Sequence, residues 1–242
     1  MNLILDKFRD LVEKHNLLKH KIGIVCNPII TDRAIGTPER KDFPLLKGKE
    51  RLMEAEFSGS YGHAYTDEFG DFEGTIEDIL SLSLETNYER AIFVSSINAV
   101  MRYLNLIECT RHCRNEGPGE CASMLLEKFN KEFSHIKHIA LIGFQPAMAQ
   151  KLSERFSLHI LDMDPDNIGK VKFGTEIKDG EKDRKEIIDM CDMALVTGTT
   201  AVNGTMMDIL DICGTKPVIV YGVTIAGIAH LMGLTRYCPK SF

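Results

Sequence analysis

Cysteine and histidine are concentrated in one short stretch of the chain, residues 108–121. On a continuous helix, the spacing of Cys109, His112 and Cys113 would place all three on one face, at i, i+3 and i+4. Cys121 follows a Gly-Pro-Gly turn near the start of the next expected helix, where the helix dipole favours a thiolate. Thiolate and imidazole bind zinc, iron, nickel, copper(I) and heavier soft ions. The pattern therefore predicts a metal site with the ligands Cys109, His112, Cys113 and Cys121.

A structural explanation of the same cluster stays open, because cysteines are often small buried hydrophobic residues. The C-x2-H-C-x7-C spacing matches none of the common zinc or iron–sulfur modules. His63, in a glycine-rich stretch, is expected in a solvent-facing loop, unless it reaches a site between domains. The remaining cysteines are scattered and are expected in the core: Cys26, Cys191, Cys213 and Cys238.

A second set of candidate residues follows predicted strands. The loops at 142–146, 197–205 and 221–224 combine glycine with hydroxyl or amide side chains, and such loops meet at the carboxyl edge of a parallel sheet, where ligands bind. Asp162 and Asp164 follow another strand, where a Rossmann protein often holds a ribose hydroxyl; a solvated turn explains them equally well. Glycine and threonine also make turns without any ligand. This edge is therefore a candidate small-molecule site that includes Gly143, Pro146, Asp162, Asp164, Thr197, Gly198, Thr199, Asn203, Thr205, Gly222 and Thr224.

The elements that must position these residues alternate between strands and helices. Strands are predicted at 91–95, 138–143, 158–162, 194–197 and 218–221. Helices are predicted from Asn98, which would cap the first of them, from the 117–119 turn, and at 147–156, 182–190 and 205–213. Strands separated by helices imply a mainly parallel sheet with helices on its faces. Residues 89–242 are therefore expected to form a Rossmann-like α/β domain.

The first 88 residues have a different pattern, which predicts a small α+β domain. An amphipathic helix is expected within 1–18, strands at 21–26, 29–35 and 52–57, and a loop at 58–63. Thr75 and Asp78 form a capping-box pattern ahead of a further helix. The fold class is thus α/β, with domains at 1–88 and 89–242.

Composition excludes several functional classes. With 29 Lys and Arg against 35 Asp and Glu, the net charge of −6 argues against a nucleic-acid partner. The uncharged stretch at 217–234 is better explained by a buried strand and helix than by a membrane span, and the charged N-terminus does not resemble a secretion signal. Seven cysteines are then expected to be reduced, which predicts a cytoplasmic protein. No P-loop, G-x-S-x-G or Ser/His/Asp pattern points to a particular reaction.

Three motifs resemble the DUF364 family, to which heavy-metal chelation has been assigned by inference: ALIGFQP at 140–146, LDMDP at 161–165 and VTGTTAVNGT at 196–205. The first part of the chain is similar to the companion DUF4213 domain. The resemblance implies an enolase N-terminal-like domain packed on a Rossmann-like domain, with a site in the cleft between them. Carried over to this sequence, it implies a cleft lined by Gly143, Phe144, Pro146, Thr197, Gly198, Thr199, Asn203 and Thr205, with a contribution from Asn98.

The leading hypothesis is a protein that binds a soft transition or heavy metal, such as zinc, iron or nickel, or a metal-bearing small molecule, at this cleft. The alternative is an enzyme with a nucleotide-like cofactor of the S-adenosylmethionine or NAD type, in which Asp162 or Asp164 holds a ribose. A third reading is a non-catalytic assembly module. The sequence is compatible with a homo-oligomer and assigns neither a reaction nor a catalytic residue.

Overall fold

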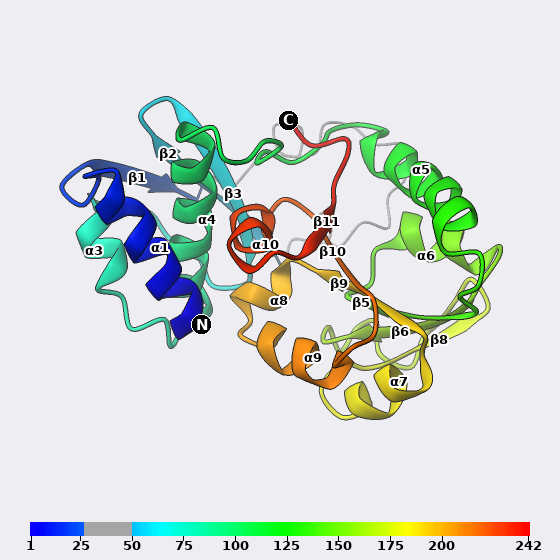
Figure 1. Cartoon of the computed structure of the whole chain (residues 1–242). Coiled ribbons are helices and arrows are strands. Elements are labelled where there is room, and N and C mark those ends of the chain that lie inside the picture. The colour runs from blue at the N-terminus through cyan, green and yellow to red at the C-terminus, as the bar shows by residue number, and fades with distance from the viewer. Residues whose placement is uncertain (27–49) are drawn as a thin grey trace.

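The computed structural model describes residues 1–26 and 50–242, and it contains a four-stranded and a seven-stranded sheet (Figure 1). The strand expected at 29–35 lies outside the described residues. Mixed α/β architecture is therefore confirmed, with one sheet from each half of the chain.

The first sheet is antiparallel, with the order β3-β2-β1-β4. Its strands and two helices are α1 (Asn2–Lys14), β1 (Lys21–Val25), β2 (Arg51–Phe57), β3 (Ser60–Thr66), β4 (Phe72–Thr75) and α3 (Ile76–Leu80). The predicted capping box is confirmed, because Thr75 and Asp78 each accept a backbone N–H of the other at the start of α3. The first helix is also confirmed, and it buries Ile4, Phe8 and Val12 on one face.

The loop expected at 58–63 is wrong, because β3 begins at Ser60 and pairs with β2 along its whole length. Only Ser58 and Gly59 form the turn, and both have positive φ angles, +48° and +82°. Two consecutive residues with positive φ angles are typical of the two-residue turn that joins the strands of a β-hairpin. His63 is consequently a strand residue with 5% of its surface exposed, not a solvent-facing loop residue.

The strand expected at 91–95 is also wrong, because these residues belong to the helix α4 (Asn87–Tyr103). This helix is capped by Thr86, so the prediction that Asn98 caps a helix is wrong too. Every residue from Ala91 to Met101 is buried, since α4 lies between the first sheet and two helices of the second half, α8 (Thr199–Val202) and α10 (Ala226–Met232) (Figure 1). A helix buried all round lacks the polar stripe that identifies a helix in a sequence.

The second sheet has the order β11-β10-β9-β5-β6-β8-β7, and all its pairs are parallel except β7 with β8. Its strands are β5 (His138–Ile142), β6 (Ser157–Asp162), β7 (Val171–Lys172), β8 (Thr175–Asp179), β9 (Met193–Thr197), β10 (Val218–Tyr221) and β11 (Thr235–Tyr237). The associated helices are α5 (Gly117–Glu132), α6 (Pro146–Ser153), α7 (Arg184–Met190), α8 (Thr199–Val202), α9 (Met206–Cys213) and α10 (Ala226–Met232). The mainly parallel sheet with intervening helices is as predicted, whereas β7, β8 and β11 were not expected.

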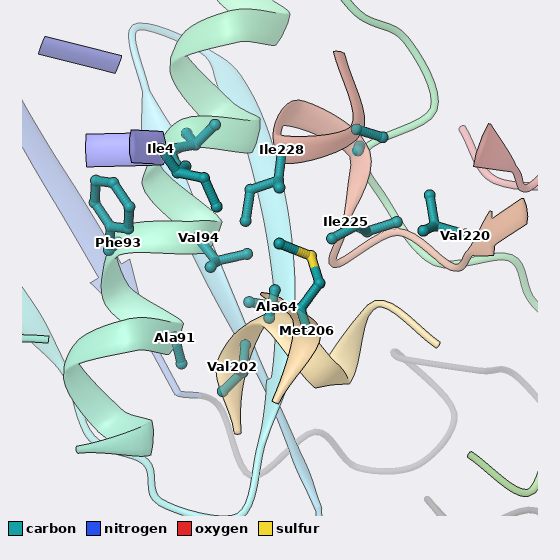
Figure 2. Packing of buried hydrophobic residues seen from close by; sticks show 14 of the residues in the cluster. Ile4, Ala64, Ala91, Phe93, Val94, Val202, Met206, Val220, Ile225 and Ile228 are labelled. Atoms are coloured by element: carbon teal, nitrogen blue, oxygen red, sulfur yellow. The ribbon is translucent and has the colours of Figure 1, made fainter. Parts of the chain in front are cut away.

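Two hydrophobic clusters hold the layers together. One lies between the second sheet and the helices α5 and α6. The other runs from α1 through the first sheet and α4 to the opposite face of the second sheet. Figure 2 shows this continuity, with Ile4 and Phe93 on one side of α4 and with Ile225, Ile228 and Met206 on the other. The two halves of the chain therefore share one core, which fixes the position of one sheet relative to the other.

Within the described residues, none of the helices combines the length and the apolar character that crossing a bilayer requires.

Candidate functional site

A cavity of about 580 Å³ opens at the carboxyl ends of β5, β6, β9 and β10. The opposite wall comes from the end of β3, from the loop that precedes α5, and from Cys238 after β11. The site therefore lies where parallel sheets usually bind ligands, and the other half of the chain covers it.

The cavity collects most of the candidate residues. Its lining includes the predicted strand-end residues Gly143, Phe144, Asp162, Asp164, Thr197, Gly198, Thr199, Asn203, Thr205, Gly222 and Thr224. It also includes the predicted metal ligands His112, Cys113 and Cys121. Pro146, Asn98 and Cys109 do not line it: Pro146 is buried in the first turn of α6, Asn98 is enclosed within α4, and Cys109 precedes the lining part of its loop.

The strand-end loops are braced against one another. Gly143 has a φ of +88°, and a Cβ at this position would lie 2.5 Å from Cγ2 of Thr197, so glycine is required for the close approach of the two loops. The Tyr221 hydroxyl donates to the carbonyl oxygen of Gly143 at 2.7 Å. The floor of the cavity is thus rigid before any ligand binds.

Several polar side chains of these loops bond to atoms of the same loop or of a neighbouring loop. Thr200 donates to the Thr197 carbonyl at 2.7 Å, and the side-chain oxygen of Asn203 accepts the Thr205 hydroxyl at 2.7 Å. Asp162 accepts the backbone N–H groups of Phe144 and Asp164, both at 2.7 Å. These bonds show that part of the polar character of the loops serves turn formation.

The soft donors come from an irregular segment, which corrects the expected helix. Because α4 ends at Tyr103, Cys109, His112 and Cys113 are not on a common helical face. Three hydrogen bonds with β3 hold the segment: the His112 N–H donates to Nδ1 of His63 at 3.1 Å, the His63 N–H donates to the Thr110 carbonyl at 3.1 Å, and the Thr110 hydroxyl donates to the Tyr61 carbonyl at 2.5 Å. The first sheet therefore positions His112 and Cys113 at the cavity.

Protonation differs between the imidazole and the thiols. Burial lowers the pKa of His112 to about 4, so its ring is neutral at pH 7. The ring contacts the Cys113 carbonyl through Nδ1 at 2.6 Å; a carbonyl only accepts, so Nδ1 carries the proton and Nε2 keeps a lone pair. Burial raises the pKa of Cys113 to about 12 and that of Cys121 to about 11. The expected thiolate at Cys121 is therefore wrong, because burial outweighs the helix dipole.

Four carboxylates line the same cavity: Glu50, Asp67, Asp162 and Asp164. No Lys or Arg is found among the lining residues of the part that the structure describes. Burial, with the charge of Asp162 next in importance, raises the pKa of Glu50 to about 7. The described wall thus carries an excess of negative charge, which favours a cation.

Glu50, Tyr65 and Cys238 are among the lining residues that the sequence analysis missed or dismissed. Tyr65 is 8% exposed, its ring packs edge-on against His112 at 5.4 Å, and its hydroxyl is buried with no hydrogen-bond partner among the described residues. A buried hydroxyl in a cavity wall can form a hydrogen bond with a bound ligand. No local motif marks these residues, because the folding of distant segments brings them together.

Among residues 1–26 and 50–242, no three His, Cys, Asp or Glu side chains are arranged so that they could hold a metal ion by themselves. A metal bound here would therefore need ligands beyond these side chains, or a rearrangement of them.

Comparisons with known proteins find a similarity to one family over part of the chain. A model of the DUF364 family, described as "Putative heavy-metal chelation", matches residues 128–234. A DUF364-family protein of unknown function from Pyrococcus horikoshii has a similar fold, with a TM-score of 0.58 and 16% identity over 91% of this chain and 79% of that one. Another, from Desulfitobacterium hafniense, has a TM-score of 0.52 and 12% identity over 76% of this chain and 72% of that one. The search of curated proteins gave no match. At these identities, the two crystal structures support the fold alone.

Proposed function

Residues 128–234 of this chain match the DUF364 family model, and from this match we propose that the protein binds a soft transition or heavy metal in the cavity at the carboxyl edge of the second sheet. The metal is carried by a small molecule that fills the rest of the space. The observation that carries the proposal is the lining itself. Cysteine thiols and a neutral imidazole face a space whose described wall holds four carboxylates and neither Lys nor Arg.

The size of the cavity favours a metal-bearing molecule over a bare ion. A volume of about 580 Å³ is typical of small-molecule pockets and far exceeds one coordinated ion. The described side chains form no complete three-ligand group, so a chelating molecule would supply the missing ligands. The buried Tyr65 hydroxyl, which has no partner among the described residues, offers such a molecule one hydrogen bond.

The candidate ligands on the protein are His112, Cys113, Cys121 and Cys238, which replaces Cys109. No three of them are grouped to hold an ion in the described residues, so the metal would use one or two of them and the small molecule would supply the rest. Nε2 of His112 has the lone pair that a metal requires. The thiols are protonated when the site is empty, and a soft metal lowers a thiol pKa enough to release the proton. Metal uptake is therefore expected to release protons.

The lining charge favours this function over the nucleotide-like alternative. The pyrophosphate of NAD would meet carboxylates instead of cations along the described wall. Asp162, one of the two residues proposed for a ribose contact beside Asp164, already accepts two backbone N–H groups. S-adenosylmethionine, whose sulfonium is positive, is the nucleotide-like ligand that fits the charge better.

The same proposal includes the finer division of the fold. Residues 1–88 correspond to an enolase N-terminal-like domain of the DUF4213 type, and residues 89–242 to a Rossmann-like domain. All seven cysteines are free thiols, which supports a reducing compartment such as the cytoplasm. Pairing of two Rossmann-like domains would make a homo-oligomer.

Elemental analysis of untagged protein purified anaerobically tests the proposal. We expect bound zinc, iron or nickel near one equivalent, and a loss of most of it in Cys113→Ser. The matched control is Cys109→Ser, since Cys109 does not line the cavity and this variant should keep the metal. Equal metal content in both variants, or a metal-free protein that takes up no added Zn²⁺ or Cd²⁺, would contradict the proposal. Thermal shifts with S-adenosylmethionine and NAD test the alternative, because a ligand at 100 times its Kd stabilises by about 2.7 kcal/mol.

A further inference from the structure

Two histidines form a pair on adjacent strands of the second sheet. His138 is the first residue of β5, and His159 is the third residue of β6. Because His159 pairs with Ala140 in the register, the two histidines lie on the same face of the sheet, one diagonal step apart. Nδ1 of His138 is 3.4 Å from Nε2 of His159, and the ring centroids are 5.6 Å apart.

This pair lies away from the cavity described above. The cavity is at the carboxyl ends of the strands, whereas His138 begins its strand and neither histidine lines the cavity. Four residue steps along β5 correspond to about 13 Å at the usual rise of a strand. The proposed function therefore makes no use of the pair.

We propose that His138 and His159 form a second, solvent-accessible site for a single divalent transition-metal ion such as Zn²⁺. Two imidazole nitrogens on one tetrahedral ion, each about 2.0–2.1 Å from the metal, are about 3.4 Å apart. The observed separation of 3.4 Å equals this span, and it is long for a hydrogen bond between two ring nitrogens. The two side chains are thus already spaced to chelate one ion.

The surroundings of the pair leave room for the remaining ligands. His138 is exposed and His159 is half-buried. The Ser157 hydroxyl lies 3.4 Å from Nε2 of His159, and an open groove of about 480 Å³ begins at these two residues. Glu176 also lines the groove, where it is paired with Lys178 at 2.7 Å. Water and the serine hydroxyl would complete the coordination, so the site is a weaker one than a closed structural zinc centre.

Competition titration of the full-length protein with Zn²⁺ tests the proposal. We expect His138→Ala and His159→Ala each to weaken one class of Zn²⁺ site at least tenfold, and the double variant to behave like either single variant. The matched control is His135→Ala, because His135 is exposed nearby and belongs to no pair among the described contacts. The cavity residues are unchanged in all four proteins, so the difference does not depend on the proposed function.

A spectroscopic measurement identifies the ligands directly. With one equivalent of Cu²⁺, electron paramagnetic resonance should detect coupling to two imidazole nitrogens in the cavity variant Cys113→Ser and to one in Cys113→Ser/His138→Ala. The proposal is overturned if His138→Ala and His159→Ala bind Zn²⁺ as His135→Ala does, or if only one of the two histidines affects binding. The first result would mean a contact between two rings without metal affinity, and the second would mean a site that uses one histidine alone.

Discussion

The side-chain oxygen of Asn98 accepts a hydrogen bond from the backbone N–H of Gly227 at 2.7 Å. The amide nitrogen of the same side chain donates to the carbonyl oxygens of His63 and Thr224 at 2.9 and 3.0 Å. Asn98 is fully buried within α4, so one side chain ties the first sheet, this helix and the loop between β10 and α10 together. It lies behind the cavity wall, where it positions Thr224 without lining the cavity as sequence reasoning expected.

Asn98→Ala is therefore expected to destabilise the protein by roughly 3 kcal/mol or more, because it leaves a buried N–H and buried carbonyls without partners. Asn130→Ala is the matched control, since Asn130 is exposed on α5, and its free energy of unfolding should change by less than about 0.5 kcal/mol. Urea denaturation measures both values. An equally small change in the two variants would mean that the Asn98 contacts contribute little.

At Gly62, the strand β3 lies in close contact with the backbone of α4. A Cβ on Gly62 would lie 2.3 Å from the backbone nitrogen of Ala99 and 2.4 Å from the carbonyl oxygen of Ser95. Backbone atoms cannot move aside as a flexible side chain can, so Gly62→Ala should cost roughly 3 kcal/mol or more, or prevent folding. Gly23→Ala is the control, because no atom lies within 4 Å of the Cβ position there. Similar melting temperatures for the two variants would contradict the close contact.

These contacts explain which parts of the structure the sequence could predict. The strands β5, β6, β9 and β10 of the second sheet were predictable because they alternate with helices, and Thr75 with Asp78 identified the start of α3. The helix α4 was not, because both the first sheet and the second half of the chain bury it and so remove its polar stripe. Its apolar run from Ala91 onward therefore resembled a buried strand.

The candidate site was also predictable only in part. Glycine and threonine after the strands indicated the edge at which the cavity lies. Glu50, Tyr65 and Cys238 come from distant segments, and only tertiary contacts place them on this wall. The spacing of Cys109 and His112 suggested a common helical face, but α4 ends at Tyr103, before the segment is reached. Spacing predicts a shared face only where the helix continues.

Glu50→Gln should make stability less dependent on pH. The pKa of Glu50 rises from an ordinary value of 4.5 to about 7 in the folded protein, chiefly because of burial. The folded state therefore binds more protons than the unfolded state between those values, and stability falls as the pH increases from about 4.5 to about 7. The variant cannot ionise, so it should be more stable than the wild type at pH 8, by an amount of order 2 kcal/mol, and similar to it at pH 4.

Urea denaturation at pH 4, 6 and 8 measures this difference. Glu85→Gln serves as the control, because Glu85 is exposed and lies outside the cavity lining. If the stability of Glu50→Gln depends on pH as strongly as that of the wild type, the buried Glu50 carboxyl is not the cause of this dependence. The same variant should bind a cationic ligand more weakly, since it removes one of the four carboxylates of the cavity.

Tyr65→Phe should increase the stability of the ligand-free protein and weaken ligand binding. The Tyr65 hydroxyl is buried and has no partner among the described residues, so its removal should stabilise the ligand-free protein by about 1 kcal/mol. A ligand that uses this hydroxyl would lose one hydrogen bond, and its affinity should fall by about five- to tenfold. Tyr103→Phe is the control, because Tyr103 is 41% exposed and does not line the cavity.

Thermal denaturation with and without bound metal measures both effects. Destabilisation of the ligand-free Tyr65→Phe protein would mean that the hydroxyl is already satisfied, and an unchanged affinity would mean that the ligand does not contact it.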